Sequence, residues 1–440
     1  MRVLLVNTSE LTGGAAVAAS RLTAALHRIG VEARLVVRDK QSDRSTTMRL
    51  PWRLRLRWSF LWERLCIWVA NGLSKRGLWA VDIANAGVDI TALPAFREAD
   101  VIHLHWVNQG LLSMKQIAKI VASGKPVVWT LHDLWPCTAI CHHTLECDRF
   151  ETHCHDCPQL RHPGAKDLSW QVFERKMAAY GQGRLTFVGV SEWTAERARK
   201  SALVQGHDVC VIPNALPVEQ FQCIDRREAR RELNLPEDAA VIAFGAARID
   251  QPMKGFPRLL EALRRLAADA QGPKPHLLLF GAIKNRSLLD SIPVPYTYVG
   301  SVAGPAALSR IYSAADVITC TSDYETFGQT LAEAMACGCT PVSFDRGGQT
   351  DIIHHLEDGY LARYADIDDF VNGLRWALQA KLPAARLREN VVTRFSEETV
   401  ARQYERLYKL NFRSSESNQA CLNCRVVTKV SEAKVNLIHI

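Results

Sequence analysis

Two glutamates stand eight positions apart in the stretch Tyr324-Glu325-Thr326-Phe327-Gly328-Gln329-Thr330-Leu331-Ala332-Glu333-Ala334-Met335-Ala336-Cys337-Gly338. An apolar run at 316–321 precedes this stretch, and a second apolar run at 340–344 follows it. This order predicts a strand, a loop, a helix and another strand, with Glu325 in the loop and Glu333 two turns into the helix. Ligands of open α/β sheets bind at the carboxyl ends of the strands, so both carboxylates are candidate ligand-binding groups.

The helix expected after Gly328 would also present unpaired backbone amides at its N-terminus. Such amides bind anions, for example a diphosphate. One carboxylate would then be placed to bind a sugar hydroxyl and the other to bind a ribose. A glutamate on a helix more often faces solvent, but two at this spacing with these neighbours favour a binding role.

Strand and helix patterns alternate in two parts of the chain. The first part begins with an apolar run at 3–6, a glycine turn at 12–15, a helical pattern at 17–29 and an apolar run at 31–37. Its further strand patterns lie at 101–104, 127–131, 186–190 and 209–213. After a charged segment, strand patterns return at 240–246, 276–281, 297–299, 317–321 and 341–344. This alternation predicts two parallel sheets with a cleft between them.

Composition limits the classes of protein that this chain can represent. A length of 440 residues predicts at least two domains, and 48% hydrophobic with 23% charged residues is ordinary for a soluble globular protein. The net charge of +8 fits a phosphorylated ligand or an anionic membrane, and it is too diffuse to indicate nucleic-acid binding. Without a signal-like segment or an apolar run of membrane-spanning length, we expect a cytoplasmic location.

Three further motifs carry chemistry typical of phosphate or sugar binding. Gly13 and Gly14 follow the first strand, where glycine lets backbone amides approach a ligand closely, although a tight turn needs the same residues. His132 stands at a strand end. Arg248 and Lys254 border a loop before a helix, where two cations would neutralise a departing diphosphate, although most such side chains are simply solvated.

In their order along residues 1–410, these four motifs resemble those of the retaining glycosyltransferases that share a Glu, seven residues, Glu motif. The resemblance implies an α/β fold of two doubly wound Rossmann-like domains facing a cleft (GT-B). It places an acceptor-side domain at 1–215 and a nucleotide-sugar-binding domain at 216–395. A C-terminal helix at 396–412 and a loosely ordered tail at 413–440 would follow.

The resemblance also assigns roles to single residues. His132 and Glu325 would act in catalysis by contacting the transferred sugar. The substrate-binding residues would be Gly13, Gly14, Arg248, Lys254, Phe327, Gly328, Gln329 and Glu333, of which Arg248 and Lys254 hold the diphosphate and Glu333 the ribose.

A Cys-rich insert at 137–160 contains a possible metal site. Cys154 and Cys157 form a Cys-x-x-Cys pair, and with Cys141 and Cys147 they would complete the thiolate set of a structural zinc. Reduced cysteines packed as small apolar residues are the alternative. The insert resembles one found in a bacterial exopolysaccharide subset of the family, the colanic-acid (WcaC-like) subset.

A second insert, at 44–79, is basic and rich in tryptophan. Its positions Leu54, Trp58, Leu61, Leu65 and Trp68 follow one face of a helix. A basic amphipathic helix with tryptophans suits an anionic membrane interface, such as the inner membrane, where an acceptor could be carried on a lipid. A helical hairpin packed on the first domain is the alternative.

With these features, the resemblance implies a retaining glycosyltransferase of exopolysaccharide biosynthesis. It would use a nucleotide-diphosphate sugar and a saccharide or lipid-linked oligosaccharide acceptor, and it would require no cofactor for catalysis. A nucleotide-sugar epimerase on the same fold and a non-catalytic sugar-nucleotide-binding subunit are the alternatives. The donor base and sugar, the acceptor, the linkage and the oligomeric state stay open.

Overall fold

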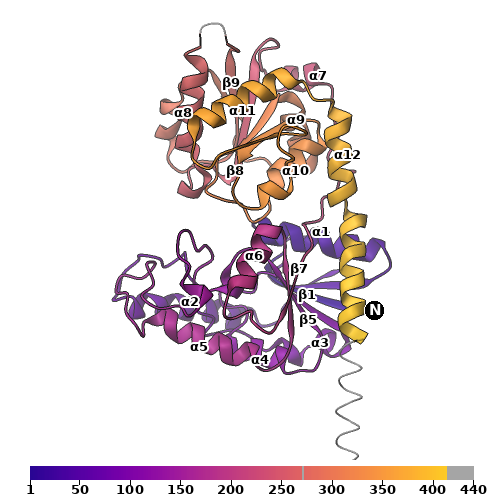
Figure 1. Cartoon of the computed structure of the whole chain (residues 1–440). Coiled ribbons are helices and arrows are strands. Elements are labelled where there is room, and N and C mark those ends of the chain that lie inside the picture. The colour runs from indigo at the N-terminus through magenta and orange to yellow at the C-terminus, as the bar shows by residue number, and fades with distance from the viewer. Residues whose placement is uncertain (270–271, 414–440) are drawn as a thin grey trace, which may run out of the picture. The chain divides into compact units, whose positions relative to one another are not determined.

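The structure is a computed structural model that describes residues 1–269 and 272–413 (Figure 1). The described chain divides into two compact units. Unit 1 contains residues 1–188, 197–210 and the described residues from 401 onward, and unit 2 contains residues 189–196 and 211–400. The last described helix, at 397–413, therefore ends in the unit that begins the chain. Apart from Arg413, the predicted tail at 413–440 lies outside the described residues.

Unit 1 is built on a seven-stranded sheet with the order β3-β2-β1-β4-β5-β6-β7. Its strands are β1 (Arg2–Ser9), β2 (Glu32–Asp39), β3 (Thr47–Arg49), β4 (Val101–Leu104), β5 (Val127–Leu131), β6 (Leu185–Gly189) and β7 (Asp208–Val211). Neighbouring strands from β3 to β5 are parallel. Because β1 pairs with both β2 and β4, the strand order reverses there, and the carboxyl ends of β1 and β4 form the edge where ligands are expected.

The α-helices of this part are α1 (Gly14–Arg28), α2 (Arg53–Ala70), α3 (Pro94–Glu98), α4 (Met114–Val121), α5 (Leu168–Tyr180) and α6 (Glu192–Lys200). Short 3-10 turns lie at Ile90–Ala92, Trp135–Cys137 and Arg149–Glu151. The apolar run Val3–Val6 is fully buried in β1, as expected for a parallel strand with both faces covered.

Unit 2 contains a six-stranded sheet with the order β10-β9-β8-β11-β12-β13, and all neighbouring strands are parallel. The strands are β8 (Ala240–Arg248), β9 (Pro275–Ala282), β10 (Tyr296–Tyr298), β11 (Val317–Cys320), β12 (Thr340–Phe344) and β13 (Tyr360–Ala362). Here the strand order reverses between β8 and β11, so their carboxyl ends are the second expected ligand edge.

The α-helices of unit 2 are α7 (Arg226–Glu232), α8 (Phe256–Ala267), α9 (Pro305–Ala314), α10 (Gln329–Ala336), α11 (Ile367–Ala380) and α12 (Ala384–Phe395). Short 3-10 turns lie at Pro252–Lys254, Arg286–Ser291 and Gly348–Asp351. Alternate residues of β8 enter different apolar clusters, with Val241 and Ala243 in one and Ile242 and Phe244 in the other. Both faces of the sheet are therefore covered, which confirms the predicted α/β fold class.

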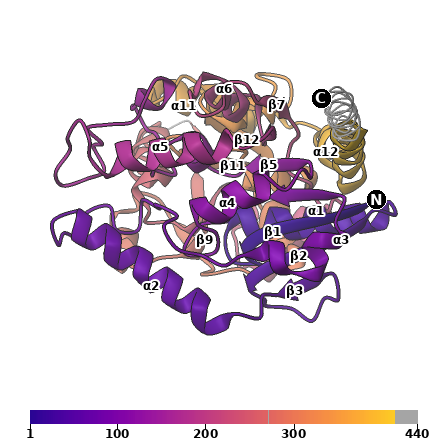
Figure 2. The same ribbon diagram turned by 90° about the horizontal axis from the view of Figure 1, so that it is seen from below.

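Helix α2 is the observed part of the predicted basic insert, and it lies at the edge of unit 1 (Figure 2). The residues that it buries are Leu56, Ser59, Glu63, Arg64 and Ile67. Its predicted apolar face is instead exposed at Leu54 (75%), Trp58 (70%), Leu61 (52%) and Leu65 (45%). The helix therefore packs on the unit through a face that includes charged residues and leaves its apolar stripe outside. No helix in the described ranges is long and apolar enough to cross a membrane.

Candidate functional site

Glu325 lies in the loop between β11 and α10, where its carboxylate binds the side chain of Lys254. Oε1 of Glu325 accepts hydrogen bonds from Lys254 Nζ at 2.6 Å and from Ser322 Oγ at 2.7 Å. The backbone N–H of Glu325 donates to Gln349 Oε1 at 3.0 Å. Burial disfavours the Lys254 ammonium, but the Glu325 carboxylate outweighs this effect and raises the pKa of Lys254. Unit 2 therefore holds a charged pair at the carboxyl ends of β8 and β11.

Two loops keep this pair together, one after β8 and one after β11. The carbonyl of Met253 accepts from the backbone N–H of Asp323 at 2.9 Å, and the carbonyl of Lys254 accepts from Thr321 Oγ1 at 3.0 Å. Gly255 has a φ of 65°, and a Cβ there would lie 1.9 Å from the Thr321 carbonyl oxygen. Glycine at this position therefore allows the Lys254 loop to approach β11 closely.

The predicted phosphate-binding amides lie at the entry into α10. Phe327 is buried, and its ring packs against Phe395 with centroids 5.4 Å apart. Gly328 is the N-cap with a φ of 104°, and Gln329 is the first helical residue. These positions match the expected helix N-terminus, while the contacts of their amides with a ligand stay a prediction.

Glu333 lines a pocket of about 190 Å³ at the carboxyl ends of β8 and β9. The side chain is buried, and Oε2 accepts a hydrogen bond from Tyr312 Oη at 3.1 Å. Phe280 forms an apolar wall of the pocket, with its ring 5.7 Å from that of Tyr312. A Cβ on Gly245 would lie 2.0 Å from the Phe280 ring, so glycine is needed beside it. An aromatic wall next to a carboxylate suits a nucleoside, whose base is flat and whose ribose carries hydroxyls.

Arg248 lies at the end of β8, behind a β-bulge that begins at Gly245. Its Nε forms an ion pair with Asp250 Oδ1 at 3.0 Å, and Asp250 also accepts the backbone N–H groups of Lys284 and Asn285. Arg248 and Lys254 thus stand at the two ends of the same loop after β8. Their joint contact with a diphosphate stays a prediction.

The predicted residues of unit 1 come together in one pocket of about 420 Å³, here called the unit 1 pocket. Its lining includes Gly13, Gly14 and His132, together with Trp106 and Asp133. Gly13 has a φ of 93°, and no atom lies within 4 Å of a Cβ built on Gly13 or Gly14. The space above both glycines is therefore open to a ligand.

The half-buried His132 ends a chain of imidazoles that continues through the buried His105 and His103. Its Nε2 lies 2.8 Å from Nδ1 of His105, and the ring of His105 lies 4.1 Å from that of His103. Nδ1 of His103 lies 2.7 Å from Tyr408 Oη, in the last described helix. Burial lowers the pKa of His132 to about 4 and lowers the pKa values of His103 and His105 well below their ordinary value. The imidazole of His132 is therefore neutral at pH 7.

Asp133, the neighbour of His132, belongs to a buried charge network that sequence analysis missed. It accepts hydrogen bonds from Trp106 Nε1 at 2.7 Å, from the backbone N–H of Trp135 at 2.9 Å and from His142 Nδ1 at 2.7 Å. Nε2 of His142 donates in turn to Asp82 Oδ2 at 2.7 Å. Burial alone would lower the pKa of His142, but the two carboxylates raise it to about 10. Burial alone would raise the pKa of Asp133, but His142 brings it down to about 2.

The network continues from Asp82 into α2. Arg64 forms an ion pair with Asp82, and it lies 3.4 Å from Glu63. Glu63 accepts hydrogen bonds from the backbone N–H groups of Ile83 and Ala84. Burial and the nearby charge of Asp82 raise the pKa of Glu63 to about 7, although the charge of Arg64 opposes this rise. Asp82, which joins the two halves of the network, lies 18 positions from Arg64 and 60 positions from His142, so no local spacing in the sequence indicated the network.

The Cys-rich insert contains free thiols. Burial, and to a smaller extent the neighbouring thiols, raises the pKa values of Cys141, Cys154 and Cys157 to about 12. Cys147 contributes to these increases, so the four sulfurs share one neighbourhood. Among residues 1–269 and 272–413, however, no three His, Cys, Asp or Glu side chains are arranged to hold a metal ion. The four cysteines therefore lie in one neighbourhood, and their binding of a zinc ion stays a prediction.

Two protein-family models match the chain. The one described as Glycosyltransferase Family 4 matches residues 12–220, and the one described as Glycosyl transferases group 1 matches residues 225–394. Between them they include the glycine turn, His132, the Lys254 loop and both glutamates.

Curated relatives match parts of the chain. The chain is 36% identical over 179 residues to a D-inositol 3-phosphate glycosyltransferase of Stackebrandtia nassauensis. This match covers 38% of this chain and 40% of that protein. The chain is also 28% identical over 301 residues to a phosphatidyl-myo-inositol mannosyltransferase of Mycolicibacterium smegmatis. That match covers 68% of this chain and 66% of that protein. The first match thus spans less than half of that relative.

Solved structures match over almost the whole chain. The crystal structure of Anabaena HepE in complex with UDP and glucose has a TM-score of 0.60 and 17% identity, and covers 93% of this chain and 99% of that one. Identity at this level shows the fold alone, which is the GT-B fold with two Rossmann-like domains.

Proposed function

Because the chain belongs to the group 1 glycosyltransferases with the GT-B fold, we propose that it transfers a sugar from a nucleotide-diphosphate sugar to an acceptor hydroxyl. The observation that carries this proposal is the Lys254–Glu325 pair at the carboxyl ends of β8 and β11. A cation for the leaving group and a carboxylate for the sugar are thereby held 2.6 Å apart.

Unit 2 binds the donor in this proposal. Glu333 accepts the ribose hydroxyls, and Phe280 packs against the base. Lys254 and Arg248 bind the diphosphate, whose negative charge grows as the glycosidic bond breaks. Two fixed cations can neutralise that charge, so we propose that transfer needs no divalent metal ion.

Transfer proceeds with retention of configuration in this proposal. A covalent route needs a carboxylate that is free to attack, whereas Glu325 is engaged by Lys254 and Ser322 and is better suited to orient a sugar hydroxyl. We therefore favour a front-face displacement. The bond from the anomeric carbon to the diphosphate breaks, the bond to the acceptor oxygen forms, and the acceptor proton passes to the departing diphosphate.

His132 supports the reaction as a neutral group. With a pKa of about 4 it carries no charge at pH 7, so it is suited to hydrogen bonding rather than to general acid catalysis. We propose that His132 binds a hydroxyl of the transferred sugar and that Gly13 and Gly14 leave room for the substrate.

The acceptor is a saccharide, and we propose that it is lipid-linked and belongs to exopolysaccharide biosynthesis. The Cys-rich insert and its resemblance to that subset support this setting. The exposed apolar stripe of α2, which includes Trp58 beside the exposed Arg55 and Arg57, supports contact with an anionic membrane surface.

A ligand screen tests the donor site. We expect one of UDP, GDP or ADP to raise the melting temperature, because a ligand at a hundred times its Kd stabilises a protein by about 2.7 kcal/mol. Glu333→Gln should lose this shift, whereas Glu357→Gln, at an exposed glutamate outside the site, should keep it. If no nucleoside diphosphate stabilises the wild type, the donor assignment is wrong.

A transfer assay separates the three candidate activities. A labelled donor should be consumed only with an acceptor present, and Glu325→Gln should abolish this consumption. Conversion of the donor without any acceptor would indicate an epimerase. Unchanged polysaccharide synthesis in cells that carry Glu325→Gln would indicate a non-catalytic subunit.

Structural zinc in the Cys-rich insert stays a proposal that rests on the clustering of Cys141, Cys147, Cys154 and Cys157. Metal analysis of protein purified without chelators tests it directly. Substoichiometric zinc in the wild type would leave the packed, reduced thiols as the better description.

A further inference from the structure

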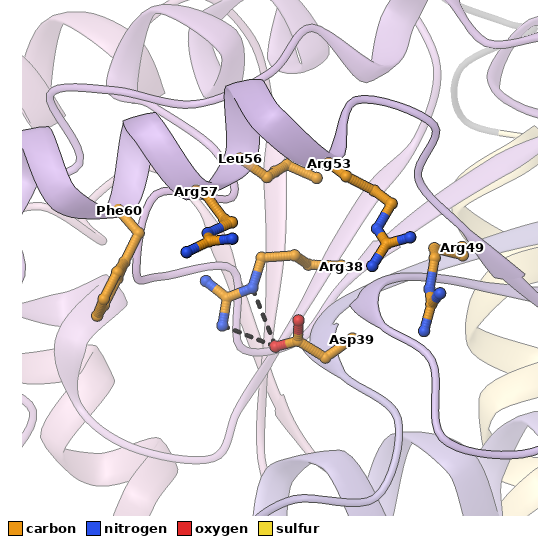
Figure 3. A pocket seen from close by; sticks show the side chains of 7 residues that line it. All are labelled: Arg38, Asp39, Arg49, Arg53, Leu56, Arg57 and Phe60. Carbon is orange, nitrogen blue, oxygen red and sulfur yellow. Dashed lines mark hydrogen bonds and ion pairs between the residues drawn. The ribbon is translucent and has the colours of Figure 1, made fainter.

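Four arginines surround a pocket of about 300 Å³ in unit 1, here called the arginine pocket (Figure 3). Arg38 comes from β2, Arg49 from β3, and Arg53 and Arg57 from α2. Figure 3 shows the guanidinium groups of Arg53 and Arg57 on the side of α2 that faces Arg38 and Asp39. Three elements that are separate in sequence thus direct positive charge to one place.

The positive charge of this pocket is only partly balanced. Asp39 is the one carboxylate in its lining, and it is already bound by Arg38 at 2.7 and 3.0 Å. Nη1 of Arg38 donates to the Gln109 carbonyl at 2.7 Å, which fixes the side chain. Within the described ranges, the exposed side chains of Arg53 and Arg57 form neither a hydrogen bond nor an ion pair. Their donors are therefore available to an anion.

The position of these arginines on α2 is unfavourable without an anion. The N-terminus of a helix carries a partial positive charge, which favours acidic residues in the first turn. Helix α2 has no acidic residue in its first turn and no side-chain N-cap, and it begins with Arg53. Helix α11, by contrast, has Asp366 as N-cap and two aspartates in its first turn. An anion bound in the arginine pocket would remove this conflict at α2.

The arginine pocket adjoins the unit 1 pocket. Arg38 and Asp39 line both, and the unit 1 pocket also contains Gly13, Gly14 and His132. A ligand with an anionic group among the arginines could therefore extend toward His132. The buried Leu56 and the half-buried Phe60 add an apolar wall on the α2 side.

We propose that the arginine pocket binds the phosphate or diphosphate group of the acceptor, whose sugar extends into the unit 1 pocket. This inference rests on the proposed function and narrows its acceptor to phosphorylated saccharides. Each guanidinium group can donate two hydrogen bonds to the oxygens of a phosphate. The positive charge of four arginines also exceeds the charge that the single carboxylate of Asp39 neutralises. The phosphate is carried either on a lipid or on a small soluble molecule.

Binding of inorganic pyrophosphate tests the pocket. All proteins carry Lys254→Met, which disables the proposed diphosphate site of unit 2. Calorimetry compares the pyrophosphate affinity of the Lys254→Met protein with that of a variant that also carries Arg53→Gln and Arg57→Gln. The matched control carries Lys115→Gln and Lys166→Gln, which remove the same charge from exposed positions of unit 1 outside the pocket. Circular dichroism checks that each variant is folded.

We expect Arg53→Gln with Arg57→Gln to weaken pyrophosphate binding by roughly tenfold or more, because each lost charge-assisted hydrogen bond weakens binding severalfold. The control should bind within about twofold of its parent. Sedimentation with phosphatidylcholine vesicles, with and without phosphatidic acid, distinguishes the sources. Binding to phosphatidic acid vesicles but not to free pyrophosphate, again lost only with Arg53 and Arg57, indicates a lipid-borne phosphate.

The proposal is overturned if neither probe binds, or if the control loses as much affinity as the pocket variant. The nucleoside diphosphate screen of the donor site is independent, because it depends on Glu333 and Lys254. Arg53→Gln with Arg57→Gln in an otherwise wild-type chain should keep the donor-induced thermal shift. A failure of the arginine pocket can therefore be told apart from a failure of the glycosyltransferase assignment.

Discussion

His142→Gln removes a buried positive charge that stands between two carboxylates. His142 lies 2.7 Å from both Asp133 and Asp82, and these carboxylates keep its pKa at about 10 against the opposing effect of burial. Glutamine retains a hydrogen-bonding amide but carries no charge. The variant therefore tests the charge of the imidazolium more than its packing.

The pKa values of the two partners bracket the expected loss of stability. A rise in the pKa of His142 from 6.5 to about 10 corresponds to roughly 5 kcal/mol, at about 1.4 kcal/mol per unit. A fall in the pKa of Asp133 from 3.8 to about 2 corresponds to roughly 2.5 kcal/mol. Both describe overlapping parts of one interaction and do not add. We expect His142→Gln to lower the free energy of unfolding by roughly 2.5–5 kcal/mol at about pH 6.

The loss should depend on pH in one direction. Because the folded-state pKa of His142 is raised, its contribution is complete below pH 6.5 and disappears as the pH rises toward about 10. The difference in stability between wild type and His142→Gln should therefore shrink across this window.

Urea denaturation at about pH 6 and about pH 9.5 measures this difference. Tryptophan fluorescence reports chiefly on unit 1, because only Trp193 and Trp376 of the 11 tryptophans lie in unit 2. His27→Gln, at an exposed histidine of unit 1, is the control and should change stability by less than about 0.5 kcal/mol. A loss that is equal at both pH values, or below about 1 kcal/mol at the lower one, would refute the charge-based reasoning.

Three further predictions concern unit 2. Glu325→Gln should reduce sugar transfer by roughly 100-fold or more but keep the donor-induced thermal shift, because Glu325 acts on the transferred sugar. Loss of both the transfer and the thermal shift would point to a folding defect. Gly255→Ala should destabilise the protein to urea by roughly 1–3 kcal/mol, because its Cβ would lie 1.9 Å from the Thr321 carbonyl. Gly304→Ala has a similar positive φ without a clash and should cost less. EDTA should leave the transfer rate within about twofold, because Lys254 neutralises the leaving group together with Arg248; complete loss would show that a metal ion is required.

The fold class could be predicted because parallel strands leave a local trace in the sequence. Both faces of such a strand are covered, so runs such as 3–6 and 240–246 are apolar without interruption. The positions of Glu325 and Glu333 followed from the strand, loop and helix around them, which are also local. The order of the strands was not predictable in this way, because it depends on pairings between distant segments.

The surroundings of the predicted residues needed the tertiary structure. The amphipathic pattern of α2 indicated an apolar face, but the structure buries Glu63 and Arg64 and leaves Leu54 and Trp58 exposed. The buried ion pair of Arg64 with Asp82 stabilises this orientation of α2. The two residues lie 18 positions apart in the sequence. Periodicity alone does not show which face of a helix a distant carboxylate will meet.

By itself, the sequence of this protein indicated every described strand except the short β3 and β13, and it indicated which polar residues stand at strand ends, because both depend on neighbouring residues. Only the tertiary structure decided which charges meet. It placed His142 between Asp82 and Asp133, and it gathered Arg38, Arg49, Arg53 and Arg57 from three separate elements. Electrostatic interactions depend on distance in space, and chain folding sets that distance independently of separation along the sequence.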